Sequence, residues 1–328
     1  MFMQALVLNR YNGPLEVTTL PRPEPGPGQV LVRIAASGLN PLDTKIRAGR
    51  AAHAKHPLPL VLGIDLAGTV VALGAGVTAF QVGDEVYGMT GGVGCIQGSL
   101  AQYAAVDADL LARKPRNLSM REAAALPLAF ITSYAGIVDR ANLQAGKKVL
   151  VQGGSGGVGH ISVQLARALG GEVFATASAH HHDLVRDLGA TPIDYRTEPV
   201  AQYMEAHTHG EGFDLVVDTV GGPTLDASFA AVKHFGHVVS ALGWGTHALA
   251  PLSFKEATYS GVFTLYPLLT GKLRAHHGEM MREATRFVEA GSLAPVVDPR
   301  RFDLRTAGDA YELVTSGTAR VKVVVEVE

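Results

Sequence analysis

Cysteine is nearly absent from this sequence: Cys95 is the one cysteine among 328 residues. A chain with one cysteine cannot form an intrachain disulfide and cannot build a zinc lobe from several thiolates. A basic surplus is absent too, because the formal net charge is -2 at pH 7 and Lys and Arg form no long cluster. The charge balance therefore argues against nucleic acid as a partner.

Long hydrophobic runs are also missing. No uninterrupted apolar stretch reaches the ~18 residues that a membrane helix needs, and the N-terminal MFMQALVLNR lacks the basic start of a secretory signal. We therefore expect a cytoplasmic protein without a membrane partner. What the chain does have is 47% hydrophobic and 18% charged residues, a composition that supports ordinary cores in about two domains.

A glycine-rich stretch, VLVQGGSGGVGHISVQLARALG, interrupts two hydrophobic patterns. Gly154, Gly156 and Gly159 fit G-x-G-x-x-G, after a strand-like run from Lys148 to Gln152. The residues that follow place an apolar stripe on one helix face: Val158, Ile161, Leu165 and Leu169. Glycines let the backbone approach a pyrophosphate, and the N-terminus of the helix stabilises its charge. This context predicts a dinucleotide-binding loop.

Strands and helices alternate after this loop, as they do in a doubly wound parallel sheet. The expected strands are EVFATAS (172–178), TPIDYR (191–196), FDLVVDTVGG (213–222) and HVVSALG (237–243). The expected helices include one that ends at Leu188-Gly189, one near 200–207, and one from Thr224 to His234 with Gly236 as its stop.

Short strands broken by turn residues precede the loop, and they predict a compact β-barrel or sandwich. They read MQALVLNR, LEVTTL, QVLVRIAASG, AGTVVALG and DEVYGM. Ser119 and Glu122 fit a capping box at the start of an alanine-rich helix that leads toward the sheet. At the other end, helices near 279–290 and 306–315 and the strand VKVVVEV form a tail, which we expect to return to the first domain.

Five segments together are similar to those of one known family, and in the same order. They are GLNPLDTKIRAG, PLVLGIDLAGTVVALGAGVTAFQVGDEVYG, AAALPLAFITSYAGI, VLVQGGSGGVG and FDLVVDTVGG. The chain resembles the zinc-free quinone oxidoreductase-like branch of the medium-chain dehydrogenase/reductase superfamily over nearly its full length. The resemblance implies an α/β protein with a GroES-like β-barrel catalytic domain, residues 1–123 completed by 267–328, and a Rossmann doubly wound domain, residues 124–266. It also implies a homodimer paired at edge strands, with 261–269 near that edge or else buried in the monomer.

The positions that hold catalytic zinc in other members of the superfamily carry Asn40, Ile64 and Leu128 here. Isoleucine and leucine have no donor atom, and Zn²⁺ takes about three protein ligands. We therefore expect no metal. Without a Lewis acid, oxidation of a saturated alcohol is disfavoured, whereas an enone or quinone delocalises the charge that hydride addition creates.

The expected function is NADPH-dependent hydride transfer to quinones or α,β-unsaturated carbonyl compounds. Two alternatives within enzyme chemistry are a zinc-independent alcohol dehydrogenase and an enoyl reductase. A third alternative is a low-turnover NADPH-binding sensor or structural protein. The resemblance favours the enzyme because this chain keeps the family's residues at two positions, Asn40 and Thr132.

By the same resemblance, Asn40 and Thr132 are the expected catalytic residues and also cofactor contacts. Asn40 would donate from its amide to the acceptor oxygen, and a role as turn residue before Pro41 is the alternative. Thr132 would lie beside the nicotinamide ring. Asp43 and Lys45, in the same loop as Asn40, are interpreted as a structural pair rather than as acid and base.

NADPH is preferred over NADH because the strand end Ala175 to Ser178 lacks the acid that binds the ribose 2'-hydroxyl in NAD sites. The other expected cofactor contacts are Gly154, Ser155, Gly156, Gly157, Val158, Ser178, His181, Tyr195, Ala241, Leu242, Gly243 and Lys322. Four of these are expected to bind the 2'-phosphate: Ser178, His181, Tyr195 and Lys322.

Overall fold

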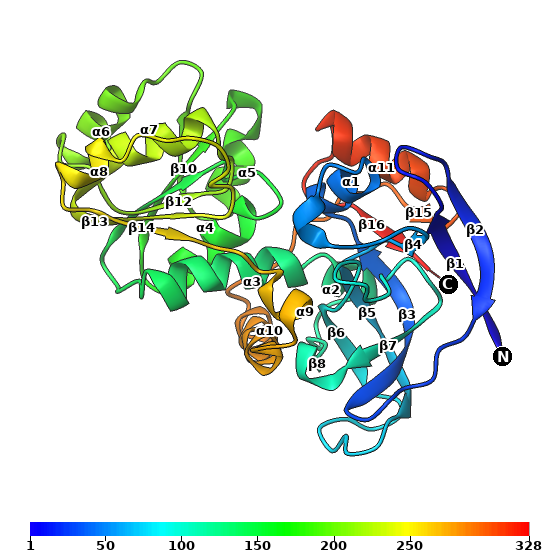
Figure 1. Ribbon diagram of the computed structural model, residues 1–328. Coiled ribbons are helices and arrows are strands. Elements are labelled where there is room, and N and C mark those ends of the chain that lie inside the picture. Colours follow the sequence, from blue (N-terminus) through cyan, green and yellow to red (C-terminus); the bar gives the residue numbers. More distant parts are fainter. Residues whose placement is uncertain (328) are drawn as a thin grey trace. The chain divides into compact units, whose positions relative to one another are not determined.

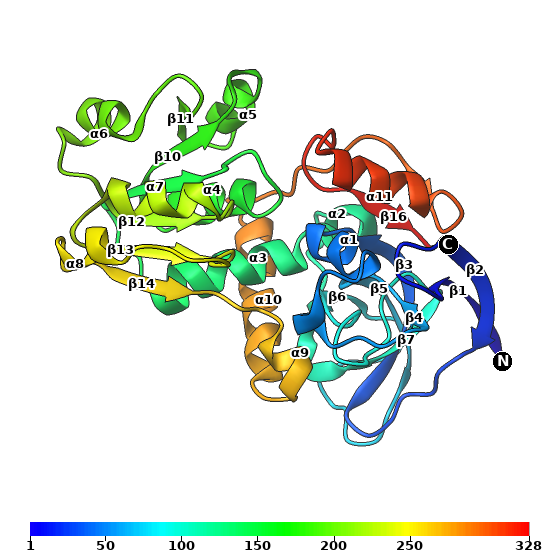
Figure 2. The same ribbon diagram turned by 45° about the horizontal axis from the view of Figure 1, so that its top comes forward.

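The computed structural model describes residues 1–327, which form two compact units. The first unit contains Met1–Leu128, Leu265–Gly291 and the chain from Pro295 on. The second contains Ala129–Thr264 and Ser292–Ala294. Each unit has its own sheets and core, drawn in Figures 1 and 2, and the mixed α/β fold expected from the sequence is confirmed.

A parallel sheet forms the second unit, with strand order β11-β10-β9-β12-β13-β14. Its strands are β9 (Lys148–Gln152), β10 (Glu172–Ala177), β11 (Thr191–Asp194), β12 (Phe213–Asp218), β13 (Val232–Ser240) and β14 (Thr258–Gly261). Its helices are α4 (Gly159–Ala168), α5 (His182–Asp187), α6 (Val200–Thr208), α7 (Pro223–Ala231) and α8 (Ala250–Ser253). α6, α7 and α8 share one core with the sheet, and α4 covers the other face (Figure 1). The arrangement confirms the doubly wound sheet.

One helix of this unit is shorter than the sequence predicts. The helix expected from Thr224 to His234 ends at Ala231, and Val232 already has extended backbone angles. Val232 is fully buried and pairs with Phe213 of β12. Burial of a β-branched side chain in the sheet therefore overrides the helical pattern.

Antiparallel strands dominate the first unit. One sheet has the order β2-β1-β4, from β1 (Phe2–Leu8), β2 (Leu15–Pro21) and β4 (Leu60–Val61). The other has the order β15-β16-β3-β5-β6-β8, with β7 also paired to β3. Its strands are β3 (Gln29–Gly38), β5 (Asp65–Leu73), β6 (Glu85–Met89), β7 (Tyr103–Asp107), β8 (Leu111–Arg113), β15 (Phe302–Asp303) and β16 (Val324–Glu326).

Helices of the first unit connect and cover these sheets. They are α1 (Pro41–Arg47), α2 (Met120–Ala124), α9 (Tyr266–Thr270), α10 (Arg274–Glu289) and α11 (Ala307–Ser316). The capping box at Ser119 is confirmed, since the backbone N–H of Ser119 donates to Glu122 and that of Glu122 donates back. α3 (Pro127–Tyr134) begins in this unit, and a π-helical turn from Ala135 to Arg140 continues it.

The C-terminal tail joins the first unit through β16, which pairs antiparallel with β3. α10 begins at Arg274, five residues before the helix start expected at Glu279, because a buried face already starts at His277. The hydroxyl of Tyr87 on β6 donates to the carbonyl of Met281 at 2.9 Å and so fixes α10 on the barrel. Among the described residues, no helix combines the length and apolar character needed to cross a membrane.

Candidate active site

The glycine-rich loop lies between β9 and α4, where the sequence places it. Gly153 has φ +75°, a conformation that favours glycine. The hydroxyl of Thr176 on β10 accepts from the Gly153 N–H at 3.0 Å and donates to Gln152 at 2.8 Å. A Cβ at Gly159 would collide with the carbonyl oxygen of Gly153. The loop therefore closes on itself only with glycine at both ends.

This loop has the shape that a pyrophosphate needs. A Cβ on Gly154 would lie 2.5 Å from the Cβ of Ala175, so the loop packs closely on β10. Gly156 is exposed at the top of the loop, and the N–H groups of His160 and Ser162 donate to the carbonyls of Gly156 and Val158 as the helix begins. The loop also carries Ser155, Gly157 and Val158. A glycine-rich loop at the N-terminus of a helix fits the diphosphate of a dinucleotide.

Two more loops converge at the same carboxyl end of the sheet. Asp218, buried at the end of β12, accepts from the amides of Val220 and Gly221 through Oδ1 and from the Ser240 hydroxyl through Oδ2. Ser240 in turn accepts from the Leu242 N–H at 3.0 Å. Asp218 thus orders the loop that contains three of the expected cofactor contacts: Ala241, Leu242 and Gly243.

Sequence reasoning missed Asp218 and Tyr259. Asp218 falls inside FDLVVDTVGG, which the sequence predicts as one strand, whereas β12 ends at Asp218. Tyr259 is on the edge strand β14, whose short sequence contains no apolar run that would predict a strand. The Tyr259 hydroxyl occupies the space that a Cβ at position 243 would need. Position 243 therefore requires glycine because Tyr259, 16 residues further along the chain, approaches it closely. No local sequence pattern indicates this contact.

Two of the expected 2'-phosphate contacts, Ser178 and His181, follow the end of β10. Ser178 is mostly buried, and the ring centroids of His180 and His181 are 4.1 Å apart. Burial, and then the neighbouring His180, lower the pKa of His181 below its usual 6.5. Tyr195, beyond β11, is exposed, and the Arg196 guanidinium lies 5.7 Å from its ring centroid. Arg196 is a cation that follows Tyr195 directly, and it is not among the 2'-phosphate contacts expected from the sequence.

Thr132 lies on α3 and is 7% exposed. Its neighbour Ser133 bonds to the Ala129 carbonyl and to the Ser162 hydroxyl on α4, at 2.9 and 2.8 Å. The helix segment that carries Thr132 is thereby joined to the helix that follows the glycine-rich loop.

A buried polar cluster occupies the first unit, and we define it as Asn40, Asp43, Asp65 and Lys322. Each of its side chains is at most 3% exposed. Asn40 Nδ2 donates to Asp65 Oδ2 at 2.9 Å and more weakly to the Gly38 carbonyl at 3.4 Å. Lys322 Nζ donates to Asn40 Oδ1 at 2.5 Å and to the Leu39 carbonyl at 3.1 Å. Both ends of the Asn40 amide are therefore held.

Asp43 and Asp65 complete the cluster. Asp43 accepts from the Asn40 N–H at 2.8 Å, in a capping box at the start of α1. Asp65 Oδ1 accepts from the N–H of Leu128, the second residue of α3, at 2.9 Å. Lys322 Nζ lies 3.9 Å from Asp65 Oδ2. The Lys322 ammonium thus lowers the pKa of both buried carboxyl groups.

Burial dominates the acid–base behaviour of the cluster. It raises the pKa of Asp43 to about 7 and that of Asp65 to about 6, and Lys322 opposes both shifts. Burial lowers the pKa of Lys322 itself, against the pull of the two carboxyl groups. Both carboxyl groups are therefore harder to ionise than a free aspartate.

The structure corrects the expectation for Lys322. Its ammonium is buried in the first unit and bonded to Leu39 and Asn40, which does not fit a role in binding an accessible 2'-phosphate. The structure also places Asp43 on the Asn40 backbone rather than in the expected pair with Lys45. Asn40 itself is 2% exposed and combines two roles, as the residue that starts α1 and as the centre of the cluster.

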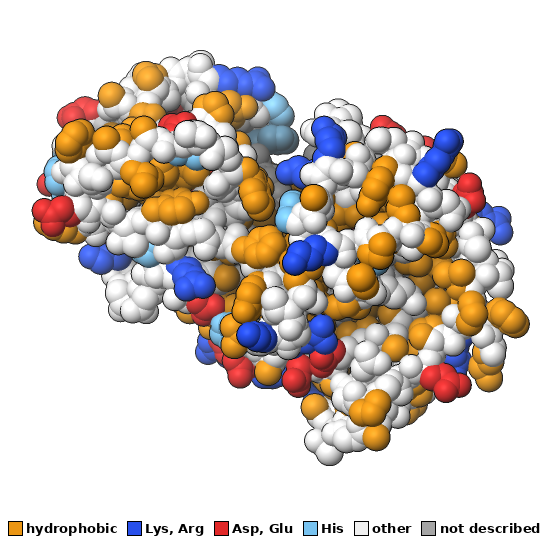
Figure 3. Space-filling view, viewed as in Figure 1, with side chains coloured by type: hydrophobic (Ala, Val, Ile, Leu, Met, Phe, Trp, Pro, Cys, Tyr) orange, Lys and Arg blue, Asp and Glu red, His pale blue; other side chains and the backbone are white. Residues whose placement is uncertain are grey.

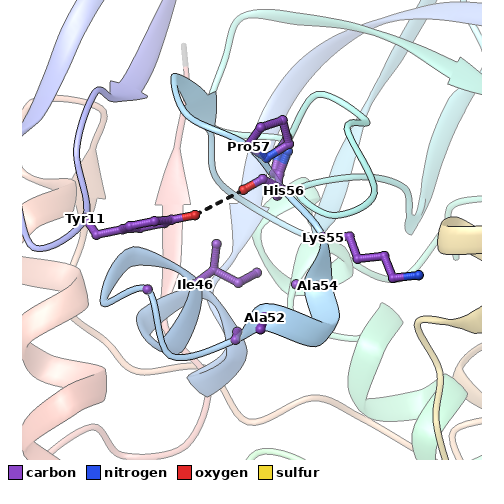
Figure 4. Close-up of a pocket in the computed structure, with 9 residues that line it drawn as sticks. Tyr11, Ile46, Ala52, Ala54, Lys55, His56 and Pro57 are labelled. Carbon is purple, nitrogen blue, oxygen red and sulfur yellow. Dashed lines mark hydrogen bonds between the residues drawn. The ribbon is translucent and has the colours of Figure 1, made fainter.

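A pocket of about 400 Å³ opens beside α1 in the first unit. Figure 4 shows Ile46 and Ala52 on one side and Tyr11 across from them, with the Tyr11 hydroxyl directed at the His56 carbonyl, 3.5 Å away. Lys55 extends away from Tyr11 in this view. Burial lowers the pKa of His56, so its ring is neutral at pH 7. The lining is mainly small and apolar.

No group of three or more His, Cys, Asp and Glu side chains gathers as a metal site would require in the part of the chain that the structure describes. Asn40 and Leu128, two of the positions compared with zinc ligands from the sequence, both contact Asp65, through the side-chain amide and the backbone N–H respectively.

Comparisons with known proteins match both parts of the chain. Residues 26–116 match the alcohol dehydrogenase GroES-like domain, and residues 188–325 match the family described as zinc-binding dehydrogenase. The chain is 38% identical to 2-methylene-furan-3-one reductase of Solanum lycopersicum over 307 residues, 90% of this chain and 71% of that protein. It is 36% identical to the chloroplastic NADPH-dependent alkenal/one oxidoreductase of Arabidopsis thaliana over 335 residues, 98% of this chain and 79% of that protein.

A solved structure is closer still. An alcohol dehydrogenase superfamily protein from Novosphingobium aromaticivorans is 60% identical and superposes with a TM-score of 0.98, covering 99% of this chain and 100% of that one.

Proposed function

The chain belongs to the zinc-free, quinone oxidoreductase-like branch of the medium-chain dehydrogenase/reductase superfamily, and from this premise we propose that it reduces quinones or α,β-unsaturated carbonyl compounds with NADPH. The relatives named for alkenal/one and furanone reduction support the enone class. Bound NADPH supplies the hydride. The protein's own residues bind the dinucleotide, orient the acceptor and stabilise the charge that develops on it.

The second unit would bind the dinucleotide. In this proposal the loop from Gly153 to Val158 and the first turn of α4 hold the pyrophosphate. Asp218 and Ser240 keep the loop from Ala241 to Gly243 in place beside it. Thr132 would contact the nicotinamide from α3, which Ser133 joins to α4.

The first unit would handle the acceptor. We propose that Asn40 donates to the acceptor oxygen through the Nδ2 hydrogen that the Gly38 carbonyl holds only at 3.4 Å. The Lys322 ammonium on Oδ1 polarises the amide and strengthens this donor. An amide stabilises a delocalised enolate or quinol-like oxygen, whereas an alkoxide from a saturated alcohol needs a stronger electrophile.

The observation that carries the choice of acceptor is the chemistry of the residues around Asp65. Asn40 Nδ2 has one hydrogen on Asp65 and a second that only the Gly38 carbonyl accepts, at 3.4 Å, and the side chains of Ile64 and Leu128 offer no metal ligand. The pocket beside α1 would take the apolar part of the acceptor, because Ile46, Ala52 and Ala54 line it.

The test is a survey of NADPH oxidation with short enones, 1,4-benzoquinone, 9,10-phenanthrenequinone and, in reverse, primary alcohols. We expect turnover with enones or quinones and little with alcohols. Ala52→Leu, which fills the pocket, should raise KM for the larger acceptors more than for the smallest enone. Good oxidation of alcohols together with inert enones and quinones contradicts the proposal.

A sensor or structural protein is the second candidate. Tight NADPH binding with no turnover of any acceptor would favour it. Its support in the structure is the depth of Asn40, which is 2% exposed and engaged at both ends of its amide.

NADPH is proposed over NADH because Ser178, rather than a carboxylate, follows the last residue of β10, and Arg196 lies two residues beyond β11. Titration of the protein's fluorescence with both dinucleotides measures the preference. Tighter binding of NADH at pH 6 to 7 would overturn it.

We also propose a cytoplasmic homodimer. β14 is an edge strand of its sheet in the described chain, and Tyr259 and Phe254 near it are exposed. Figure 3 shows hydrophobic side chains on the face of the second unit that carries α7 and α8. Beyond β14, Leu265 and Leu268 are buried in the first unit, so these two lie within the monomer rather than at the edge. Sedimentation at several concentrations tests the dimer, and cell fractionation tests the location.

A further inference from the structure

The two oxygens of Asp65 hold two different parts of the proposed site. Oδ2 accepts from the Asn40 amide at 2.9 Å, and Oδ1 accepts from the Leu128 N–H at 2.9 Å. Leu128 is the second residue of α3, and Thr132 follows it by one helical turn on the same helix face. A single carboxylate therefore joins the residue proposed to orient the acceptor with the first turn of the helix proposed to contact the nicotinamide.

We propose that Asp65 is a positioning residue for hydride transfer: it fixes the amide of Asn40 and the start of α3 in register, with Lys322 as its counter-charge. The inference rests on the proposed function and assigns a role that neither the motifs nor the expected cofactor contacts include. Asp65 touches no reacting atom in this scheme. It acts through Asn40 and through the position of α3.

Geometry explains why aspartate is required at this position. Asn40 and Leu128 both present N–H donors, so the residue between them must accept twice, in two directions. Asparagine has one acceptor oxygen, and its NH₂ group would face one of the two donors. Glutamate keeps both oxygens but is longer by one methylene in a fully buried space.

The charge of Asp65 is balanced within the same cluster. Lys322 Nζ lies 3.9 Å from Asp65 and donates to Asn40 Oδ1, so the ammonium, the amide and the carboxylate form a continuous chain. Removing one member of such a network leaves buried donors or charge without compensation. These contacts restrict the Asn40 amide to one orientation, with its oxygen toward Lys322 and its nitrogen toward Asp65.

Steady-state kinetics of Asp65→Asn, Asn40→Ala and the double variant test the inference. Asp65→Asn should lower kcat by about 10- to 100-fold while the Kd for NADPH changes by less than about threefold, because the loss concerns orientation during transfer. Since Asp65 acts through Asn40, the double variant should be little slower than the slower single variant. Multiplicative losses, or an unchanged kcat in Asp65→Asn, overturn the inference.

The matched control is Asp84→Asn. Asp84 also accepts from a backbone N–H, that of Gln81, and from a cation, Arg113, but lies outside the cluster. Its variant should keep the wild-type kcat. If Asp65→Asn does not fold, Asp65→Glu replaces it and should show the same split between kcat and NADPH affinity.

Hydrogen exchange of the Leu128 amide supplies a readout that does not depend on turnover. Exchange should speed up in the Asp65 variant and stay unchanged in Asp84→Asn. Unchanged exchange at Leu128 contradicts the positioning role even if the enzyme is active. A wild-type protein that reduces no acceptor instead refutes the proposed function, whatever the exchange shows.

Discussion

The glycine-rich loop and the buried polar cluster solve the same problem, the exact placement of hydrogen-bond donors, in opposite ways. The loop comes from consecutive residues, 153–159, and its glycines at 153, 154 and 159 have no room for a Cβ. The cluster uses side chains from distant parts of the chain, Asn40, Asp65 and Lys322, and is almost fully buried. The first is damaged by adding atoms, and the second by removing or exchanging a single polar atom.

The largest effect we expect is from Gly159→Ala. Its Cβ would collide with the carbonyl of Gly153, both being backbone-defined positions that cannot rotate away. The loop must open, at a cost of about 1–3 kcal/mol in stability, and NADPH affinity should fall by about 100-fold or more. Calorimetric titration and thermal unfolding measure the two effects.

Gly156→Ala is the matched control for this variant. A Cβ at Gly156 meets only the Gly153 carbonyl, at 3.2 Å, and Gly156 is exposed. The apo protein should keep its stability, and the variant should lose cofactor affinity alone. If both variants bind NADPH as tightly as the wild type does, this loop does not hold the dinucleotide.

Asn40→Ala should act on turnover rather than on cofactor binding. It removes the proposed donor and leaves Lys322 and Asp65 each without one partner. We expect kcat to fall by about 10- to 100-fold at the scale of one or two hydrogen bonds, with NADPH affinity nearly unchanged. A loss confined to NADPH affinity would place Asn40 at the cofactor instead.

These two regions also differ in what the sequence alone predicts. β9, the glycine-rich loop and α4 come from consecutive residues with a strong pattern, and the structure places all three where they were expected. Asp65 gave no signal, because its two partners are 25 and 63 residues away. The sequence predicts Lys322 as a cofactor contact because no pattern in the residues around it indicates that this lysine is buried. Long-range pairing between β16 and β3 brings it to Asn40.

Asp43→Asn should change how stability depends on pH. The folded pKa of Asp43, about 7, lies above its ordinary value of 3.8, so its contribution is complete below about pH 4 and is lost as the pH rises through 7. The variant keeps an acceptor for the Asn40 N–H. Its free energy of unfolding, relative to wild type, should therefore rise by about 2–4 kcal/mol from pH 4 to pH 8.

His277 makes this comparison with wild type necessary. Burial lowers its pKa from 6.5 to about 4, so its contribution is present above pH 6.5 and is lost as the pH falls through 4. The two groups oppose each other in wild type. Urea unfolding of both proteins at each pH isolates Asp43, and parallel curves for the two would contradict its raised pKa.

Arg196→Ala should weaken NADPH binding and leave NADH binding nearly unchanged. The guanidinium stacks on the exposed Tyr195 at the end of β11, and an exposed charge pair with a phosphate is worth about a five- to tenfold change in affinity. Arg186→Ala is the control, because Arg186 is exposed on the neighbouring α5 and pairs with Asp183. Equal losses for both dinucleotides would remove Arg196 from the 2'-phosphate site.

His181→Ala should have the smallest effect, and one that depends on pH. The pKa of His181 is lowered by burial and by the His180 ring, so the imidazole is neutral at pH 8 and gains positive charge only at a pH below its usual 6.5. A cation at this position attracts a phosphate, and a neutral ring does so much less. The ratio of wild-type to variant NADPH affinity should be about three at pH 6 and about one at pH 8. A ratio that is the same at both pH values would show that His181 acts by shape rather than charge, and the selectivity would then depend on Ser178 and Arg196.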